Sequence, residues 1–121
     1  MWIEPKTDWK AVTDSKGNYQ GDYFNAWDYN RIKNNMIFLY EAFNITPPRL
    51  GNDKEVLSDI FAREVNALEE ALEYLRVHVA DLDIGMMKEY FQNGRALTYD
   101  EVNRIESGQK KLYDYWAGGG S

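Results

Sequence analysis

Residues 24 to 43 of the chain read Phe24-Asn-Ala-Trp-Asp-Tyr-Asn-Arg-Ile-Lys-Asn-Asn-Met-Ile-Phe-Leu-Tyr-Glu-Ala-Phe43. This stretch carries a helix start signal, because Asn25 can cap the first turn and Asp28, three residues later, can reach back to it. Apolar side chains follow at helical spacing in one stripe: Tyr29, Ile32, Met36, Leu39, Tyr40 and Phe43. The pattern predicts a helix over residues 25–44 with one face in a core, and Trp27, Ile37 and Phe38 form a second, partly apolar face.

A second stretch, Leu97-Thr-Tyr-Asp-Glu-Val-Asn-Arg-Ile-Glu-Ser-Gly-Gln-Lys-Lys-Leu-Tyr-Asp-Tyr-Trp116, repeats part of this pattern. Five residues recur 73 positions later: Asn30, Arg31, Ile32, Leu39 and Tyr40 return as Asn103, Arg104, Ile105, Leu112 and Tyr113. Thr98 and Glu101 have the spacing of a capping box, which predicts a helix that ends near Trp116. Gly108 in its middle costs about 1 kcal/mol relative to alanine, so we expect another backbone to approach closely there.

Two further helices are expected between these stretches. Pro47 and Pro48 end the first helix and predict a loop over residues 44–52. A long helix is expected over residues 53–79, capped by Asn52 and forming the spine of the fold, and a short one over residues 83–94 with Met86 and Met87 among its apolar positions. We therefore predict an all-α fold: residues 24–116 form a small antiparallel bundle of three long helices and one short one.

Residues 1–23 show no sustained period and are expected to form an extended, aromatic N-terminal arm. Gly17 and Gly21 favour a loose hairpin from about Lys10 to Tyr23. Trp2 and Trp9 either fold back onto the helices, which we favour, or dock on a partner. At the other end, residues 117–121 are expected to be a flexible glycine-rich tail.

Length and composition indicate a single domain. The 121 residues contain no cysteine, so disulfides and thiolate chemistry are excluded. The chain shows no signal peptide and no run of 18 apolar residues, so we expect a soluble protein made in the cytoplasm. The net charge of −6 belongs to residues 53–83, which hold nine Asp or Glu against three Lys or Arg.

No arrangement typical of an enzyme is visible in the sequence. There is no nucleophile with a base, no metal-ligand cluster and no phosphate-binding glycine loop. The single histidine, His78, has no second histidine with which to share a metal. We therefore expect no catalytic activity, no cofactor, no metal and no small-molecule substrate. A basic stripe is also missing, so nucleic acid is not an expected partner, and neither is a membrane.

The abundant aromatic residues and the two Asn-Arg pairs favour protein contacts instead. Arg31 can pair with Asp28, and Arg104 with Glu101, because each acid lies three residues before its arginine. Each pair can serve in a buried, fold-specifying role or in partner recognition, and the sequence leaves both open. The candidate interaction residues are Trp2, Trp9, Tyr19, Tyr23, Trp27, Arg31 and Arg104.

Four motifs carry a resemblance to a known group of proteins: Pro5-Lys-Thr-Asp-Trp9, Gly21-Asp-Tyr-Phe-Asn25, Asp28-Tyr-Asn-Arg-Ile-Lys-Asn-Asn35 and Leu97 to Glu106. Over about half of its length the chain resembles short tail and baseplate structural proteins of tailed phages and prophages of low-GC Gram-positive bacteria. It departs from them at residues 11–20, which look like an insertion. The resemblance implies a virion structural component, made in the host cytoplasm, that acts by oligomerisation and contacts with other virion proteins. The alternative is a small acidic phage-encoded adaptor or inhibitor that binds a host protein through the Glu-rich face of the second helix.

Overall fold

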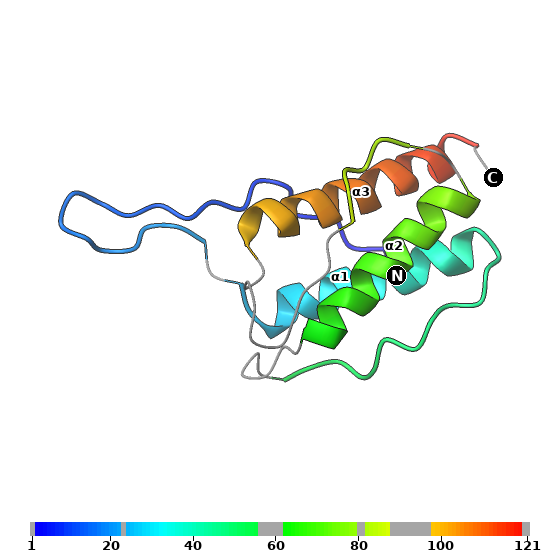
Figure 1. Cartoon of the computed structure of the whole chain (residues 1–121), viewed down its shortest axis with the longest axis horizontal. Helices are drawn as coiled ribbons and strands as arrows, with labels where there is room; N and C mark the ends of the chain where they lie inside the picture. The colour runs from blue at the N-terminus through cyan, green and yellow to red at the C-terminus, as the bar shows by residue number, and fades with distance from the viewer. Residues whose placement is uncertain (1, 23, 56–61, 80–81, 88–97, 120–121) are drawn as a thin grey trace.

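The computed structural model describes residues 2–22, 24–55, 62–79, 82–87 and 98–119. Within these residues the chain forms three helices and no strand, which confirms the predicted all-α bundle. The helices are α1 (Ala26–Ala42), α2 (Ala62–His78) and α3 (Tyr99–Ala117). Figure 1 shows that all three run in the same direction, so the predicted antiparallel arrangement is wrong. The cause lies in the connections, which are long enough to return along the outside of the bundle instead of making short turns.

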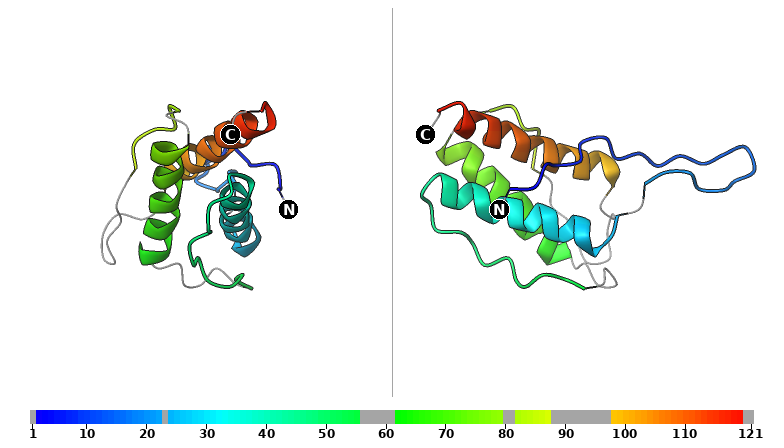
Figure 2. Two further views of the ribbon diagram at one scale, coloured as in Figure 1. Left: turned by 90° about the vertical axis from the view of Figure 1, so that its right-hand side faces the viewer. Right: turned by 180° about the vertical axis from the view of Figure 1, so that it is seen from behind.

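Three extended segments accompany the helices, and we call them straps: residues 2–9, residues 45–55 and residues 82–87. Figure 2 shows each strap on a different side of the bundle. The first lies against α1 and α3, the second against α1 and α2, and the third against α2 and α3. Each strap runs opposite to the helices (Figure 1), so every helix is preceded by its own returning segment.

The start and the apolar stripe of α1 match the prediction. Asn25 caps the helix and forms a complete capping box with Asp28. In α3, Thr98 accepts a hydrogen bond from the Glu101 N–H, as expected of an N-cap. The centre of the bundle is made of three leucines, Leu39, Leu75 and Leu112, each fully buried. One leucine from each helix therefore meets at the core.

The three helices are copies of one sequence pattern. Glu64-Val65-Asn66 of α2 matches Glu101-Val102-Asn103 of α3, and Asp28-Tyr29-Asn30 of α1 stands at the same place. The asparagines are 36 and 37 residues apart, within the range of repeat proteins. Later positions in the pattern are buried in all three copies: Ile32, Leu68 and Ile105; Met36, Leu72 and Gln109; Leu39, Leu75 and Leu112. The described residues thus form three strap-helix units, and the sequence predicted the repeat only between the helices of the first and third units.

Two predicted helix starts are wrong. Residues 51–55 are not helical, although a helix was expected from Asp53, and the described part of α2 begins at Ala62. Over the described residues α2 has 17 residues and α3 has 19, so α2 is not the longest helix there. Residues 82–87 form an extended strap where a short helix was expected to begin, and the rest of that expected helix lies outside the described residues.

Gly108 lies at a close approach, but the neighbouring groups are side chains and not the backbone that we expected. A Cβ at this position would lie 3.1 Å from the Ile84 Cβ and 3.2 Å from a methyl group of Leu72. Ile84 belongs to the third strap and is buried. Because Gly108 has no side chain, Ile84 of the third strap packs closely against α3 beside Leu72 of α2.

Candidate functional site

A buried ion cluster joins α1, α3 and the first strap at the repeated Asn-Arg motif. The Glu106 carboxylate is fully buried and accepts two hydrogen bonds of 2.8 Å from Arg31, one from Nε and one from Nη2. It also accepts a 2.7 Å bond from Trp9 Nε1 and a 3.2 Å bond from the Lys6 backbone N–H. Arg31 in turn donates to Asp28 over 2.8 Å, as the sequence predicted.

The surroundings of Arg31 keep it charged. Burial alone would lower the pKa of its guanidinium, but the hydrogen bonds and negative charges of Glu106 and Asp28 more than offset this and raise that pKa. A two-pronged pair of this kind is geometrically specific. Breaking it is costly, because the remaining charge stays buried without its partner. Between the two roles left open for Arg31, the structure therefore supports the buried, fold-specifying one.

The second Asn-Arg motif, Asn103-Arg104 in α3, makes a similar arrangement between α3 and α2. Arg104 binds Glu101 over 2.8 Å and also pairs with the buried Glu69 of α2. Glu69 and Glu106 occupy the same place in the repeat, three residues after the asparagine. The two arginines thus link α1 to α3 and α3 to α2, each through a buried glutamate.

The asparagines of the motif clamp the straps. Asn103 accepts from the Trp9 backbone N–H over 2.7 Å and donates to the Trp9 carbonyl oxygen over 3.0 Å. Asn30 binds the backbone of Lys54 in the same two-way manner, with both distances 2.8 Å. A third amide, Asn35, holds both backbone groups of Ile3. A side-chain amide matches one residue of an extended backbone in this way, which explains why asparagine recurs here.

The third interface, between α1 and α2, lacks the arginine-glutamate pair. Ala67 of α2 stands at the arginine position, and Lys33 of α1 stands at the glutamate position. Lys33 is buried and binds Asp53 and the Gly51 carbonyl oxygen of the second strap instead. At this interface alanine replaces the arginine and lysine replaces the glutamate. The one buried charge that results, on Lys33, is paired with Asp53.

Most of the predicted interaction residues serve the fold of the chain itself. Trp9 is 5% exposed, and Trp2 stacks on Tyr113 with ring centroids 4.3 Å apart. The favoured expectation that these two rings fold back onto the helices is therefore confirmed. Trp27 differs: it is 58% exposed and lies over Arg31, with the guanidinium 5.1 Å from the ring centroid. Tyr23 lies outside the described residues.

The predicted hairpin is present over residues 10–22. Thr13 and Tyr19 form an antiparallel bridge, and backbone hydrogen bonds join Gln20 to Val12. The Asp22 carbonyl oxygen accepts from the Tyr99 hydroxyl and ties the base of the hairpin to α3. Figure 1 shows the rest of the hairpin projecting from one end of the bundle. The side chains of Val12 and Tyr19 on this hairpin are exposed. The arm thus has two parts: a strap held on the bundle and a projecting hairpin.

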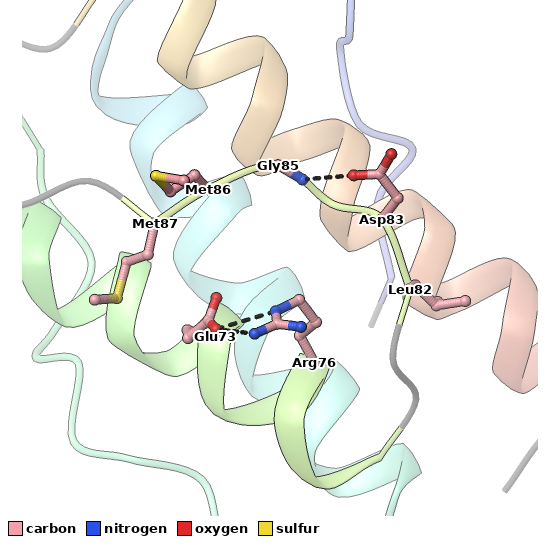
Figure 3. Close-up of a pocket in the computed structure, with 7 residues that line it drawn as sticks. All are labelled: Glu73, Arg76, Leu82, Asp83, Gly85, Met86 and Met87. Atoms are coloured by element: carbon pink, nitrogen blue, oxygen red, sulfur yellow. Dashed lines mark hydrogen bonds and ion pairs between the residues drawn. The ribbon is translucent and has the colours of Figure 1, made fainter.

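A hollow of about 780 Å³ lies between α2 and the third strap, and Figure 3 shows residues that line it. On its α2 side, Arg76 pairs with Glu73. On its strap side, Met86 is 85% exposed and Met87 is also exposed, so neither of these apolar side chains belongs to the core. Residues 80–81 and 88–97, at both ends of this strap, lie outside the described residues, and we assign no site to this hollow.

The described part of the chain contains no group of three or more His, Asp or Glu side chains that could hold a metal ion. Within the same residues, no helix combines the length and apolar character needed to cross a bilayer. His78 packs against Tyr74 with ring centroids 4.1 Å apart and the ring planes tilted by 33°.

Comparison of the chain with protein-family models, with curated proteins and with solved structures finds no match. The repeat that the sequence analysis missed leaves a short signal, since Glu-Val-Asn occurs at both 64–66 and 101–103. The backbone groups of Trp9 and Lys54 that the asparagines bind leave no signal in the sequence, because almost every residue type supplies the same N–H and C=O groups.

Proposed function

We propose that the chain is a non-enzymatic structural protein of a phage tail or baseplate, which acts through self-association and contacts with other virion proteins. The projecting hairpin, residues 10–22, is the observation that carries this proposal. A two-stranded hairpin is only marginally stable alone in water, and its outer edges offer unpaired N–H and C=O groups. Such a hairpin is suited to pairing with a strand of a neighbouring subunit.

The structure changes which part of the arm we assign to assembly. Trp2 and Trp9 contact the chain's own helices, so we set aside the alternative that these two rings dock on a partner and do not assign the first strap to assembly. Val12 and Tyr19 are exposed on the hairpin and take over this role. The motif resemblance supports the virion setting, and the hairpin supports the mode of action.

The alternative, an adaptor that binds a host protein through an acidic face of α2, has less support. Internal ion pairs engage three acids of α2: Glu64 with Lys54, Glu69 with Arg104, and Glu73 with Arg76. Glu69 is also buried, so its carboxylate does not lie on the surface that a host protein would contact. The negative face that this alternative requires is thus largely neutralised by the chain itself.

The test replaces residues 11–21 by a short Gly-Ser linker and compares the variant with the full chain by sedimentation velocity. We expect the melting temperature to stay close to that of the full chain, because the hairpin contributes no core residue, and the subunit count to fall. Lys16→Ser, at the hairpin turn, is the control and should leave both properties unchanged. An unchanged subunit count after loss of the hairpin, or a full-length chain that stays monomeric at high concentration, would contradict the proposal.

A further inference from the structure

The groove between α1, α2 and the second strap has a filled counterpart elsewhere in the molecule. It has a volume of about 540 Å³ and is lined in part by Tyr40, Tyr74, Ala67 and Ala71. The two tyrosine rings are 6.0 Å apart. We call it the Tyr40-Tyr74 groove.

The counterpart lies between α3 and α1, at the same positions of the repeat. Tyr113 stands ten residues after its asparagine, as Tyr40 does, and Phe38 stands eight residues after its asparagine, as Tyr74 does. The rings of Phe38 and Tyr113 are also 6.0 Å apart. Both interfaces therefore present the same pair of aromatic walls.

The occupant of the counterpart is a tryptophan on an extended segment. Trp2 lies 4.3 Å from Tyr113 and 5.8 Å from Phe38, measured between ring centroids. Asn35 then holds the backbone of the next residue, Ile3. One interface of the bundle thus shows which kind of side chain packs against such a pair of rings.

The Tyr40-Tyr74 groove lacks this occupant because the second strap differs from the first. Trp2 lies seven residues before the clamped Trp9, and Pro47 lies seven residues before the clamped Lys54. Proline is smaller than tryptophan, and Ala71 and Ala67 stand where α1 has Asn35 and Arg31. Ile45, Pro48 and Leu50 line the groove on the strap side, and Pro47 does not supply the large ring that Trp2 supplies to the counterpart.

We propose that the Tyr40-Tyr74 groove binds a tryptophan or tyrosine side chain carried by an extended segment of a partner protein. The ring lies against Tyr40 and Tyr74, as Trp2 lies against Tyr113 and Phe38. Ala67 and Ala71 form the floor, and the partner backbone passes beside the second strap. This inference rests on the internal repeat and does not depend on the virion assignment.

A short peptide that copies the natural occupant tests the proposal. Acetyl-Trp-Ile-Glu-Pro-amide is titrated into the isotope-labelled full chain, with acetyl-Leu-Ile-Glu-Pro-amide as the matched control. We expect saturable chemical-shift changes centred on the amides of Ala67 and Ala71 with the first peptide only. Shifts centred on Tyr113 and Phe38 would show that the peptide displaces Trp2, and they would overturn the proposal. Equal shifts with both peptides, or no saturable shift, would overturn it as well.

Two variants locate the binding. Tyr74→Ala removes one wall and should weaken binding about two- to tenfold, the loss expected for one aromatic contact. Tyr115→Ala is its control, since Tyr115 is 37% exposed, Tyr74 is 45% exposed, and Tyr115 does not line the groove. Ala67→Met narrows the groove from the other side and should cause a similar loss without removing a ring. Binding that is unchanged in Tyr74→Ala and Ala67→Met would refute the assignment.

Discussion

Glu106→Gln removes one negative charge from the interface of α1 and α3 and changes almost no volume. Oε1 of Glu106 accepts from Arg31 Nε and the Lys6 N–H, and Oε2 accepts from Arg31 Nη2 and Trp9 Nε1. Whichever way the glutamine amide is turned, its NH₂ group faces two donors. Two hydrogen bonds are therefore lost, and the buried Arg31 keeps only Asp28 as a counter-charge.

Loss of one partner from a buried ion pair typically costs 3–5 kcal/mol, and we expect Glu106→Gln to lower the free energy of unfolding by about that amount. Urea unfolding followed by circular dichroism measures it. The control is Glu4→Gln, because Glu4 pairs with Lys110 on the surface and its side chain is 68% exposed. This control should cost less than about 0.5 kcal/mol.

A double variant separates charge from packing. Arg31→Met combined with Glu106→Met removes both charges of the pair and leaves Asp28 as the remaining buried acid of the cluster, so the loss should be smaller than the sum of the losses in the two single variants. A loss below about 1 kcal/mol for Glu106→Gln would refute the view that this cluster holds the strap and the two helices together.

Three further predictions concern the repeat and the titration of the core. Ile32→Ala and Ile105→Ala should each cost about 2–4 kcal/mol in urea unfolding, because both side chains are buried at the same place in the repeat; an unmoved midpoint for either would show that the copies are not equivalent. Asn103→Ala should cost about 1–3 kcal/mol, because it leaves the N–H and C=O groups of Trp9 without their clamp; rapid exchange of the Trp9 amide hydrogen is the readout, and continued protection would argue against it. Burial raises the pKa of Tyr40 to about 12 from an ordinary value of about 10, so the folded state holds this proton more tightly, its contribution to stability is complete below about pH 10, and stability falls as the pH rises from about 10 to 12. Urea midpoints measured across this range should drop less steeply in Tyr40→Phe, and equal slopes would contradict the assignment.

The helix starts of α1 and α3 could be predicted because their signals are local. Asn25 and Asp28, or Thr98 and Glu101, lie within one turn of each other, so the capping geometry follows from four consecutive residues. The pairing of Arg31 with Asp28 could be predicted for the same reason. Its second partner, Glu106, is 75 residues away and becomes visible only when the helices are placed side by side.

The direction of the helices could not be predicted from periodicity. An apolar stripe shows which face is buried but is identical for parallel and antiparallel packing. The third copy of the repeat was missed because α2 keeps only the asparagine and the later leucine of the five recurring residues, whereas Ala67, Leu68 and Arg76 stand where the other copies have arginine, isoleucine and tyrosine. Residues 53–55, the end of the second strap, were expected to be helical because the hydrogen bonds of Asn30 to the Lys54 backbone, which hold them extended, leave no local signal in the sequence.

The parallel arrangement underlies the repeat, the clamps and the Tyr40-Tyr74 groove, and one distance comparison tests it. The chain has no cysteine, so pairs of spin labels can be placed at will. One pair sits at Arg63 and Asp100, and the other at Val77 and Asp100. Arg63 and Val77 are about 21 Å apart along α2 at 1.5 Å per residue, and Asp100 lies at the start of α3. Electron-electron resonance should give the shorter distance for the pair at 63 and 100, and a shorter distance for the pair at 77 and 100 would show that α2 and α3 are antiparallel and would contradict the account.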